Sequence, residues 1–174
     1  MSEEIQPSQN PVQEPDNFNS ILIGGGLIVF FGLVPYLSFV NMCCLGLIAG
    51  GTLSVWHYTN AFSLTLSSGE GFKLGALTGI LGGLVLYVLQ MLCLVLFDYQ
   101  PGTEEMGMIM KSFMKGNPEA LEAYEQGIQD SKLNAFSVKN IAIGVLSTVI
   151  IYPLFVGLGG TIGAALFKKA PEVK

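Results

Sequence analysis

The chain has 174 residues, of which 51% are hydrophobic and only 12% are charged, and its formal net charge is −5. Soluble domains carry about 25% charged residues, so this composition is typical of a membrane protein. All eight cationic side chains are lysines. The absence of arginine and the negative charge together argue against nucleic acid as a partner.

The first 17 residues contain three prolines and four acidic residues. This composition predicts a disordered acidic tail over residues 1–17, because it offers too little apolar surface to bury. The tail lacks a basic n-region, so we do not expect a signal peptide. From residue 17 to residue 69 the chain has no charged side chain. A membrane span needs about 20 apolar residues, so this stretch is long enough for two spans and a turn.

The first span is predicted over Asn19–Tyr36, with Asn19 or Ser20 as its N-terminal cap. Pro35 should end the helix, because a proline forces the residue before it out of helical geometry. A short turn over residues 38–41 is expected to follow at the membrane face. We therefore expect the chain to reverse direction within a few residues of Pro35.

The second span is predicted over Met42–Thr59, where Gly46 and Gly50 lie four residues apart. It closes with Trp56, His57 and Tyr58. Aromatic side chains with polar tips favour the headgroup level of a bilayer, so this cluster is expected to mark the exit from hydrocarbon. Residues 60–70 are rich in Ser and Thr and are expected to form a linker.

The third span, Gly71–Phe97, has glycines at a strict spacing of four residues. In a soluble helix each glycine costs about 1 kcal/mol relative to alanine. In a bilayer the same spacing forms a groove that a second helix can approach closely. The pattern therefore predicts a helix-packing face, and the same step recurs in the second and fourth spans. The predicted helix-packing residues are Gly71, Gly75, Gly79, Gly83, Gly46, Gly50, Gly159 and Gly163.

Polar residues of the third span have local roles. Ser67 or Ser68 is expected to cap the helix, and Glu70 in the first turn favours its N-terminal dipole. Glu70 and Lys73 lie three residues apart and are expected to pair on one face. Gln90 lies deep in the span, and an interhelical hydrogen bond is its expected role.

Residues 98–137 form the one polar insertion, and two helices are predicted within it. Met and Phe side chains at helical spacing predict an amphipathic helix over Glu104–Lys115. We favour packing of this apolar stripe on the protein's own spans over contact with the membrane surface, because nearby acidic residues limit attraction to anionic lipid. Asn117 as cap and Pro118 at the first position predict a second helix that ends near Lys132.

The fourth span is predicted over Val138–Phe167, with Pro153 inside it. Proline kinks a soluble helix, but neighbouring helices in a membrane re-satisfy the backbone. Lys168 and Lys169 are expected to stop the span at the interface, so residues 138–169 form the last membrane segment. A short tail, residues 170–174, follows.

The predicted fold is an all-α membrane protein in which residues 18–97 supply three transmembrane helices and residues 138–169 the fourth. The four helices form two antiparallel hairpins, so both termini lie on one side. The lysines near helix ends slightly favour the cytoplasm for that side.

His57 is the only histidine, and a single imidazole is able to ligate a haem or a chlorophyll-type pigment. The simpler interpretation is an interfacial histidine that bonds a headgroup or a neighbouring helix, and we predict no cofactor. The three cysteines lie in apolar stretches without metal-ligand spacing, so no metal site is predicted. No acidic residue lies in the middle of a span, which lowers the expectation of an ion or proton path.

A glycine-stepped span that begins Gly71-Phe72-Lys73-Leu74-Gly75 leads into the polar insertion, and the last span ends in the segment Gly159–Lys169. This layout resembles a group of small four-span bacterial inner-membrane proteins classed only as domains of unknown function. The Asn41–Tyr58 segment, with its Cys-Cys and Gly-Gly-Thr-Leu, is similar to such proteins too. The resemblance covers residues from about 20 to 169. It implies a bacterial inner-membrane location and transfers no functional residue.

These observations favour an accessory or scaffold subunit, not an enzyme, that packs against lipid and against other membrane subunits or copies of itself. One alternative is a small-solute transporter or channel-like protein, with Pro153 and the Ser and Thr residues of spans two and four lining a path. The other is a cofactor-bearing subunit that uses His57.

Overall fold

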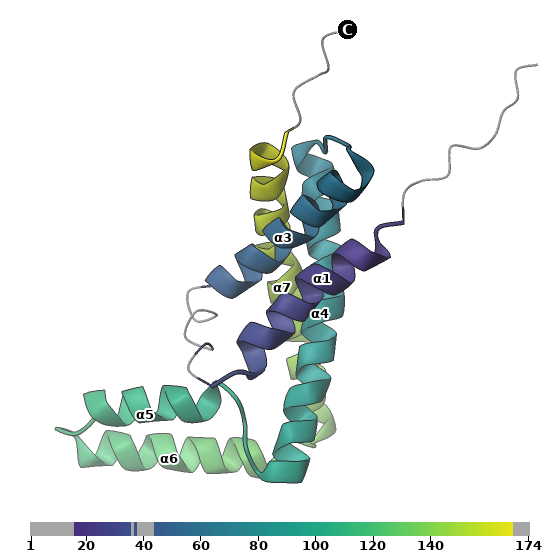
Figure 1. Ribbon diagram of the computed structural model, residues 1–174. Helices are drawn as coiled ribbons and strands as arrows, with labels where there is room; N and C mark the ends of the chain where they lie inside the picture. The colour runs from purple at the N-terminus through teal and green to yellow at the C-terminus, as the bar shows by residue number, and fades with distance from the viewer. Residues whose placement is uncertain (1–15, 36, 38–43, 169–174) are drawn as a thin grey trace, which may run out of the picture.

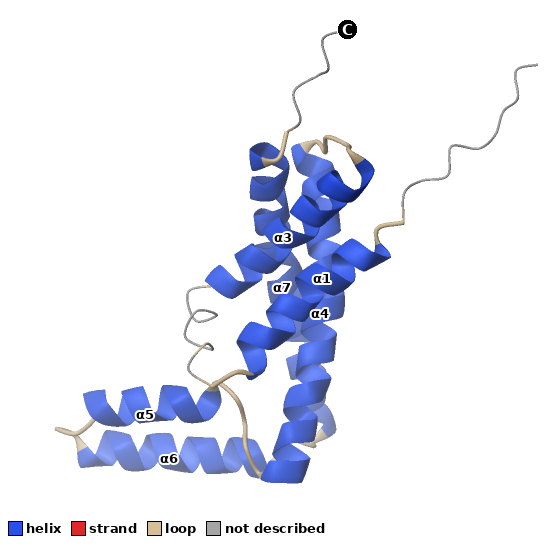
Figure 2. Ribbon diagram, viewed as in Figure 1, coloured by secondary structure: helices blue, strands red, loops and turns tan. Residues whose placement is uncertain are grey.

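The computed structural model describes residues 16–35, 37 and 44–168. For Glu104 and Glu105 it describes the backbone but not the side chains. Throughout the described residues the regular structure is helical (Figure 2). This confirms the predicted all-α class. The tail predicted over residues 1–17 lies outside the described residues except for Asp16 and Asn17, as do the turn over 38–41 and the tail over 170–174.

Of the six described helices, four pack into a bundle, and the other two form an arm that extends sideways from one end of it (Figure 1). The bundle end where α4 begins and α7 stops is called the termini end below, and the opposite end, where α4 stops and α7 begins, is called the arm end. In chain order the helices are α1 (Phe18–Leu33), α3 (Leu45–Phe62), α4 (Ser68–Phe97), α5 (Thr103–Phe113), α6 (Pro118–Leu133) and α7 (Val138–Leu166).

Helices α4 and α7 are long and apolar enough to cross a membrane. They have 30 and 29 residues, which at about 1.5 Å per residue exceeds a hydrocarbon thickness of about 30 Å. Helix α1 is apolar but has only 16 residues. Helix α3 has 18 residues and becomes polar toward its C-terminal end. Two of the four predicted spans therefore meet the length and composition that a crossing requires, and the other two do not.

The start of α1 differs from the prediction. The backbone N–H of Phe18 donates to Asp16 Oδ1 at 2.9 Å, and the helix begins at Phe18. The cap predicted at Asn19 or Ser20 is wrong, because Ser20 is fully buried and its hydroxyl bonds to another helix. Further along, α3 continues to Phe62, past the predicted end at Thr59.

The first turn of α4 is fixed by side chains. Ser67 Oγ accepts from the backbone N–H of Glu70 at 3.3 Å, and Glu70 Oε2 accepts from the backbone N–H of Ser67 at 2.7 Å. This reciprocal capping box satisfies two donors that the first turn leaves open. Glu70 therefore bonds to the cap, and no ion pair within 4 Å joins it to Lys73. Helix α4 begins at Ser68, three residues before the predicted span.

Helices α4 and α7 pack along their length, and α1 and α3 cross over them on one side (Figure 1). The larger side chains of the core are few, and Ile28, Val55, Leu86 and Val156 are the hydrophobic ones among those fully buried. Glycines at the helix contacts let the backbones of neighbouring helices approach closely. Helix α7 runs continuously through Pro153.

Candidate functional site

The glycine step of α4 faces α7. A Cβ atom built on Gly75 would collide with the Val156 carbonyl oxygen and would lie 3.1 Å from the Cα atoms of both Gly157 and Gly160. One built on Gly79 would lie 2.8 Å from the Tyr152 carbonyl oxygen, beside Pro153. Real Cβ atoms are essentially never found under 3.0 Å from another heavy atom. A side chain at these positions would therefore push the two backbones apart.

The remaining glycines named from sequence also lie inside the bundle. A Cβ on Gly50 would lie 3.0 Å from the Gly24 carbonyl oxygen on α1, and one on Gly163 would lie 3.0 Å from Val55 Cβ on α3. Gly71 and Gly83 face α7, Gly159 faces the backbone of Ile48 on α3, and Gly46 is buried. The glycine-lined faces are thus occupied by the protein's own helices and are closed to another subunit.

A buried pair of hydroxyls joins α3 to α4. Thr78 Oγ1 donates to the Leu74 carbonyl oxygen at 2.8 Å and lies 2.9 Å from Ser54 Oγ. A hydroxyl has one proton to donate, so Ser54 is the donor to Thr78 in this pair. Both side chains are fully buried. The pair is complete within the bundle and leaves Thr78 without a free donor for a solute.

A second pair joins α1 to α3 and includes His57. Ser20 Oγ lies 2.9 Å from His57 Nδ1, and the imidazole is half-buried. If His57 were the ligand of a haem or pigment, it would bind through Nε2. Ser20 would then hold Nδ1, as hydrogen-bond partners of metal-ligating histidines do. No group of three His, Cys, Asp or Glu side chains in the described part of the chain is placed to hold a metal ion. The Ser20 bond alone accounts for the position of His57.

We expect Ser20→Ala and His57→Ala to destabilise the folded protein non-additively. Their coupling energy should be about 0.6 kcal/mol and no more than about 1.7 kcal/mol, the range for hydrogen bonds between membrane helices. Thermal unfolding of the two single variants and the double variant in detergent measures it. Additive effects, together with a visible absorption band that disappears in His57→Ala, would contradict a hydrogen bond between the helices as the role of His57. They would indicate a cofactor site instead.

Helices α5 and α6 touch each other at a few points within the arm. Lys111 Nζ pairs with Glu125 Oε1 at 2.8 Å, and Gly107 on α5 is buried beside α6. Asn117 caps α6 through the backbone N–H of Ala120 at 3.2 Å, and Pro118 begins that helix, where both were predicted. At the base of the arm, Asn140 Nδ2 donates to the Asn134 carbonyl oxygen at 2.9 Å.

The apolar stripe of α5 does not pack along the bundle as predicted. The arm extends away from α4 and α7 (Figure 1). Among the described helices, α1, α3, α4 and α7 pack on one another, and neither α5 nor α6 makes more than isolated contacts with them. Helix α5 ends at Phe113, not Lys115. Of the stripe, Phe113 is 83% exposed, and Met106, Ile109, Met110 and Met114 are half-buried. The local sequence pattern identified the stripe correctly but not what covers it.

Gln90 also differs from its predicted role. It lies on α4, closer to the arm end than Leu86. Leu86 itself packs beside Gly32, near the end of α1. The side chain is half-buried, and within the described part of the chain no hydrogen bond to it is formed. The expected interhelical hydrogen bond is therefore absent there, and an amide remains unpaired on a long apolar helix.

A cavity of about 680 Å³ lies at the arm end between α4, α6 and α7. Tyr87, Met91 and Ile143 give it an apolar wall, and Asp130 and Asn140 contribute polar groups. Its lining includes one lysine, Lys139, which is exposed. Sequence reasoning missed this cavity, because it is formed where three segments far apart in the chain meet.

No family model, curated protein or solved structure matches this chain.

Proposed function

We propose that this chain is an integral membrane protein in which α1, α3, α4 and α7 all cross the bilayer. We propose further that it acts by binding, as an accessory or scaffold subunit of a larger membrane assembly, without catalysis of its own. The proposed location is a bacterial inner membrane with both termini in the cytoplasm.

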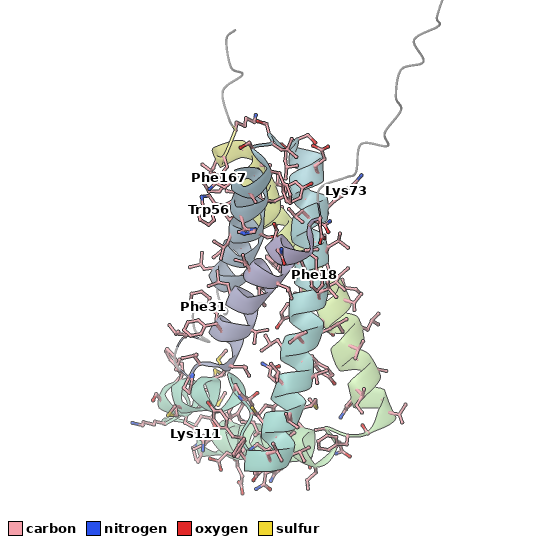
Figure 3. All side chains as sticks on the ribbon, turned by 45° about the vertical axis from the view of Figure 1, so that its right-hand side comes forward. Phe18, Phe31, Trp56, Lys73, Lys111 and Phe167 are labelled. Carbon is pink, nitrogen blue, oxygen red and sulfur yellow. The ribbon has the colours of Figure 1, made fainter. Side chains whose placement is uncertain are left out.

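The pattern of exposure supports a lipid environment. In the most apolar 18-residue window of α4 only 22% of the residues are buried, and in that of α7 only 17%. A long core helix of a soluble protein is mostly buried, so these helices would expose a large apolar surface to water. In hydrocarbon the same surface has no such cost. Figure 3 shows Trp56 and Phe167 close to the termini end, where an interfacial aromatic belt is expected.

The unpaired amide of Gln90 is the observation that carries the binding role. A polar side chain within a membrane is stabilised by hydrogen bonding to another helix, and the described helices of this chain do not supply a partner. Around it, the arm-end half of α4 exposes large apolar side chains, including Val88 at 64% and Leu96 at 61%. A second protein that packs there would pair the amide and cover this surface.

The transporter alternative receives less support from the packing. Thr52 Oγ1 lies 2.9 Å from the Ile48 carbonyl oxygen and 3.0 Å from that of Gly159, so its one proton is donated within the bundle and is not available to a solute. Gly51 and Gly159 bring α3 and α7 too close for even a methyl group between them. Measured solute flux in proteoliposomes would support the transporter alternative.

The test is gentle extraction from the native membrane, followed by identification of the co-purifying chains. We expect a stoichiometric complex whose yield falls threefold or more in Gln90→Leu, because a membrane hydrogen bond contributes about 0.6–1.7 kcal/mol. The matched control is Gln126→Leu, the same change on the exposed surface of α6. Recovery of wild-type protein only as a clean homo-oligomer would contradict the accessory role.

A further inference from the structure

The seam between α1 and α4 opens outward at two adjoining cavities. One, of about 530 Å³, lies near the termini end, where Asn17 precedes α1, where Glu70, Lys73 and Leu77 lie on α4, and where Tyr58 of α3 and the loop residues 64–66 complete the lining. The other, of about 430 Å³, includes Phe18 and Leu81. Asn17 and Phe18 are consecutive, and Leu77 and Leu81 are one turn apart on α4, so the cavities follow each other along the seam. Figure 3 shows Phe18 beside α4 with Lys73 nearer the termini end.

The two cavities differ in chemistry. The first combines a carboxylate and an ammonium group with several leucines, whereas every side chain that lines the second is apolar, from Phe18 and Leu22 on α1 to Leu81 and Val85 on α4. A molecule that fills both must have a charged head and a hydrocarbon tail. From Lys73 to Val85 the seam extends about 18 Å along the helix, close to the thickness of about 15 Å of one hydrocarbon leaflet.

Glycine creates the space in the apolar cavity. Helix α1 crosses α4 where Gly25 meets Gly82, and a Cβ on Gly82 would lie 2.9 Å from the Cα atom of Gly25. The next residue, Gly26, is exposed in the cavity lining, and a Cβ built there would meet no heavy atom within 4 Å. Close packing explains Gly25 and Gly82, but it does not explain Gly26.

The charges select the head. Lys73 is exposed in the cavity lining and suits a phosphate, while Glu70 adds a negative charge next to it. Glu70 Oε2 accepts from the Ser67 backbone, which leaves the other carboxylate oxygen for a donor. A purely anionic head would be repelled by Glu70, and a quaternary amine has no N–H to donate to it.

We propose that the α1–α4 seam binds one zwitterionic phospholipid with a primary amine in its headgroup, of the phosphatidylethanolamine type. Its phosphate lies against Lys73, its ammonium donates to Glu70, and one acyl chain fills the cavity beside Gly26. The inference rests on the proposed membrane location and adds a specific ligand to it.

Native mass spectrometry of the full-length, delipidated protein tests the proposal in detergent that contains equal amounts of three phospholipids with identical acyl chains. The headgroups are ethanolamine, choline and glycerol. We expect a one-to-one adduct that favours ethanolamine at least fivefold over each of the others. Lys73→Gln should weaken this adduct, and Glu70→Gln should remove the preference for ethanolamine over choline, since glutamine keeps the capping box.

The cavity is tested by filling it. Gly26→Leu should reduce the adduct at least fivefold, and Val85→Trp should do so from the α4 side. Ala165→Leu adds a similar side chain at an exposed position of α7 outside the seam and should leave the adduct unchanged. A thermal unfolding midpoint within a few degrees of wild type shows that each variant is folded.

An adduct that persists in both Gly26→Leu and Val85→Trp, when both are folded, would overturn the proposal. Tightest binding of the lipid with the glycerol headgroup, or the absence of any adduct, would also overturn it. The proposed membrane location would survive each of these results, because it is tested separately, by whether the protein is soluble without detergent.

Discussion

Gly75→Leu is expected to separate α4 from α7. The glycine Cα atoms on α7 lie only 3.1 Å from the position that any Cβ would occupy, and they belong to backbone that cannot rotate away. Overpacking a core costs about 1–3 kcal/mol, and a whole leucine at a backbone contact should reach or exceed the upper value. Thermal unfolding followed by circular dichroism, in detergent or nanodiscs, should show a loss of the cooperative transition or a large drop in its midpoint.

The matched control for this prediction is Gly26→Leu. It makes the same chemical change on a bundle helix, but a Cβ at that position has open space around it. Glycine and leucine differ by about 1 kcal/mol in helix propensity in favour of leucine, so the control should be neutral or slightly stabilising. Equal unfolding midpoints for Gly75→Leu and Gly26→Leu would mean that α4 and α7 do not meet at the glycine step.

Leu86→Ala is expected to destabilise the bundle by about 2–5 kcal/mol. Leu86 is 1% exposed, and its side chain occupies the space that Gly32 leaves on α1. Removal of the side chain leaves a cavity that two rigid helices cannot close. The control is Leu92→Ala, at a residue of the same helix that is 49% exposed, where the change should cost within about 0.5 kcal/mol. Chemical or thermal unfolding of both variants measures the difference, and equal losses would contradict the assigned packing of α1 on α4.

Much of the local structure was readable from the sequence, because it depends on short-range rules. The spacing of Gly71 through Gly83 predicted one packing face, and the structure places that face against α7. The Ser67–Glu70 box and the Asn117–Pro118 helix start follow from donors that every helix must satisfy. In each case the residues that decide the outcome lie within a few positions of one another.

The features that sequence reasoning missed depend on distant segments. The sequence pattern predicts Ser20 as a possible cap, but its hydroxyl bonds to His57, which lies 37 residues further on. Gln90 was expected to bond to another helix, yet α1 ends at Leu33, and the preceding Gly32 meets α4 at Leu86, one turn before Gln90. The stripe of α5 was expected on the bundle, but the arm turns away from it (Figure 1). Local periodicity identifies an apolar face, whereas topology decides what that face meets.

The central claim is that lipid surrounds all four bundle helices. For α1 and α3 it needs a direct test, because length and composition alone do not identify them as membrane spans. Spin labels placed one at a time in a cysteine-free variant, reconstituted in bilayers, test it directly. The positions are Leu22 on α1, Leu53 on α3, Val85 on α4 and Leu154 on α7. We expect dissolved oxygen to relax all four labels more strongly than a water-soluble nickel chelate does. Dominant relaxation by nickel at Leu22 and Leu53 would show that α1 and α3 lie outside the bilayer and would contradict the four-span account.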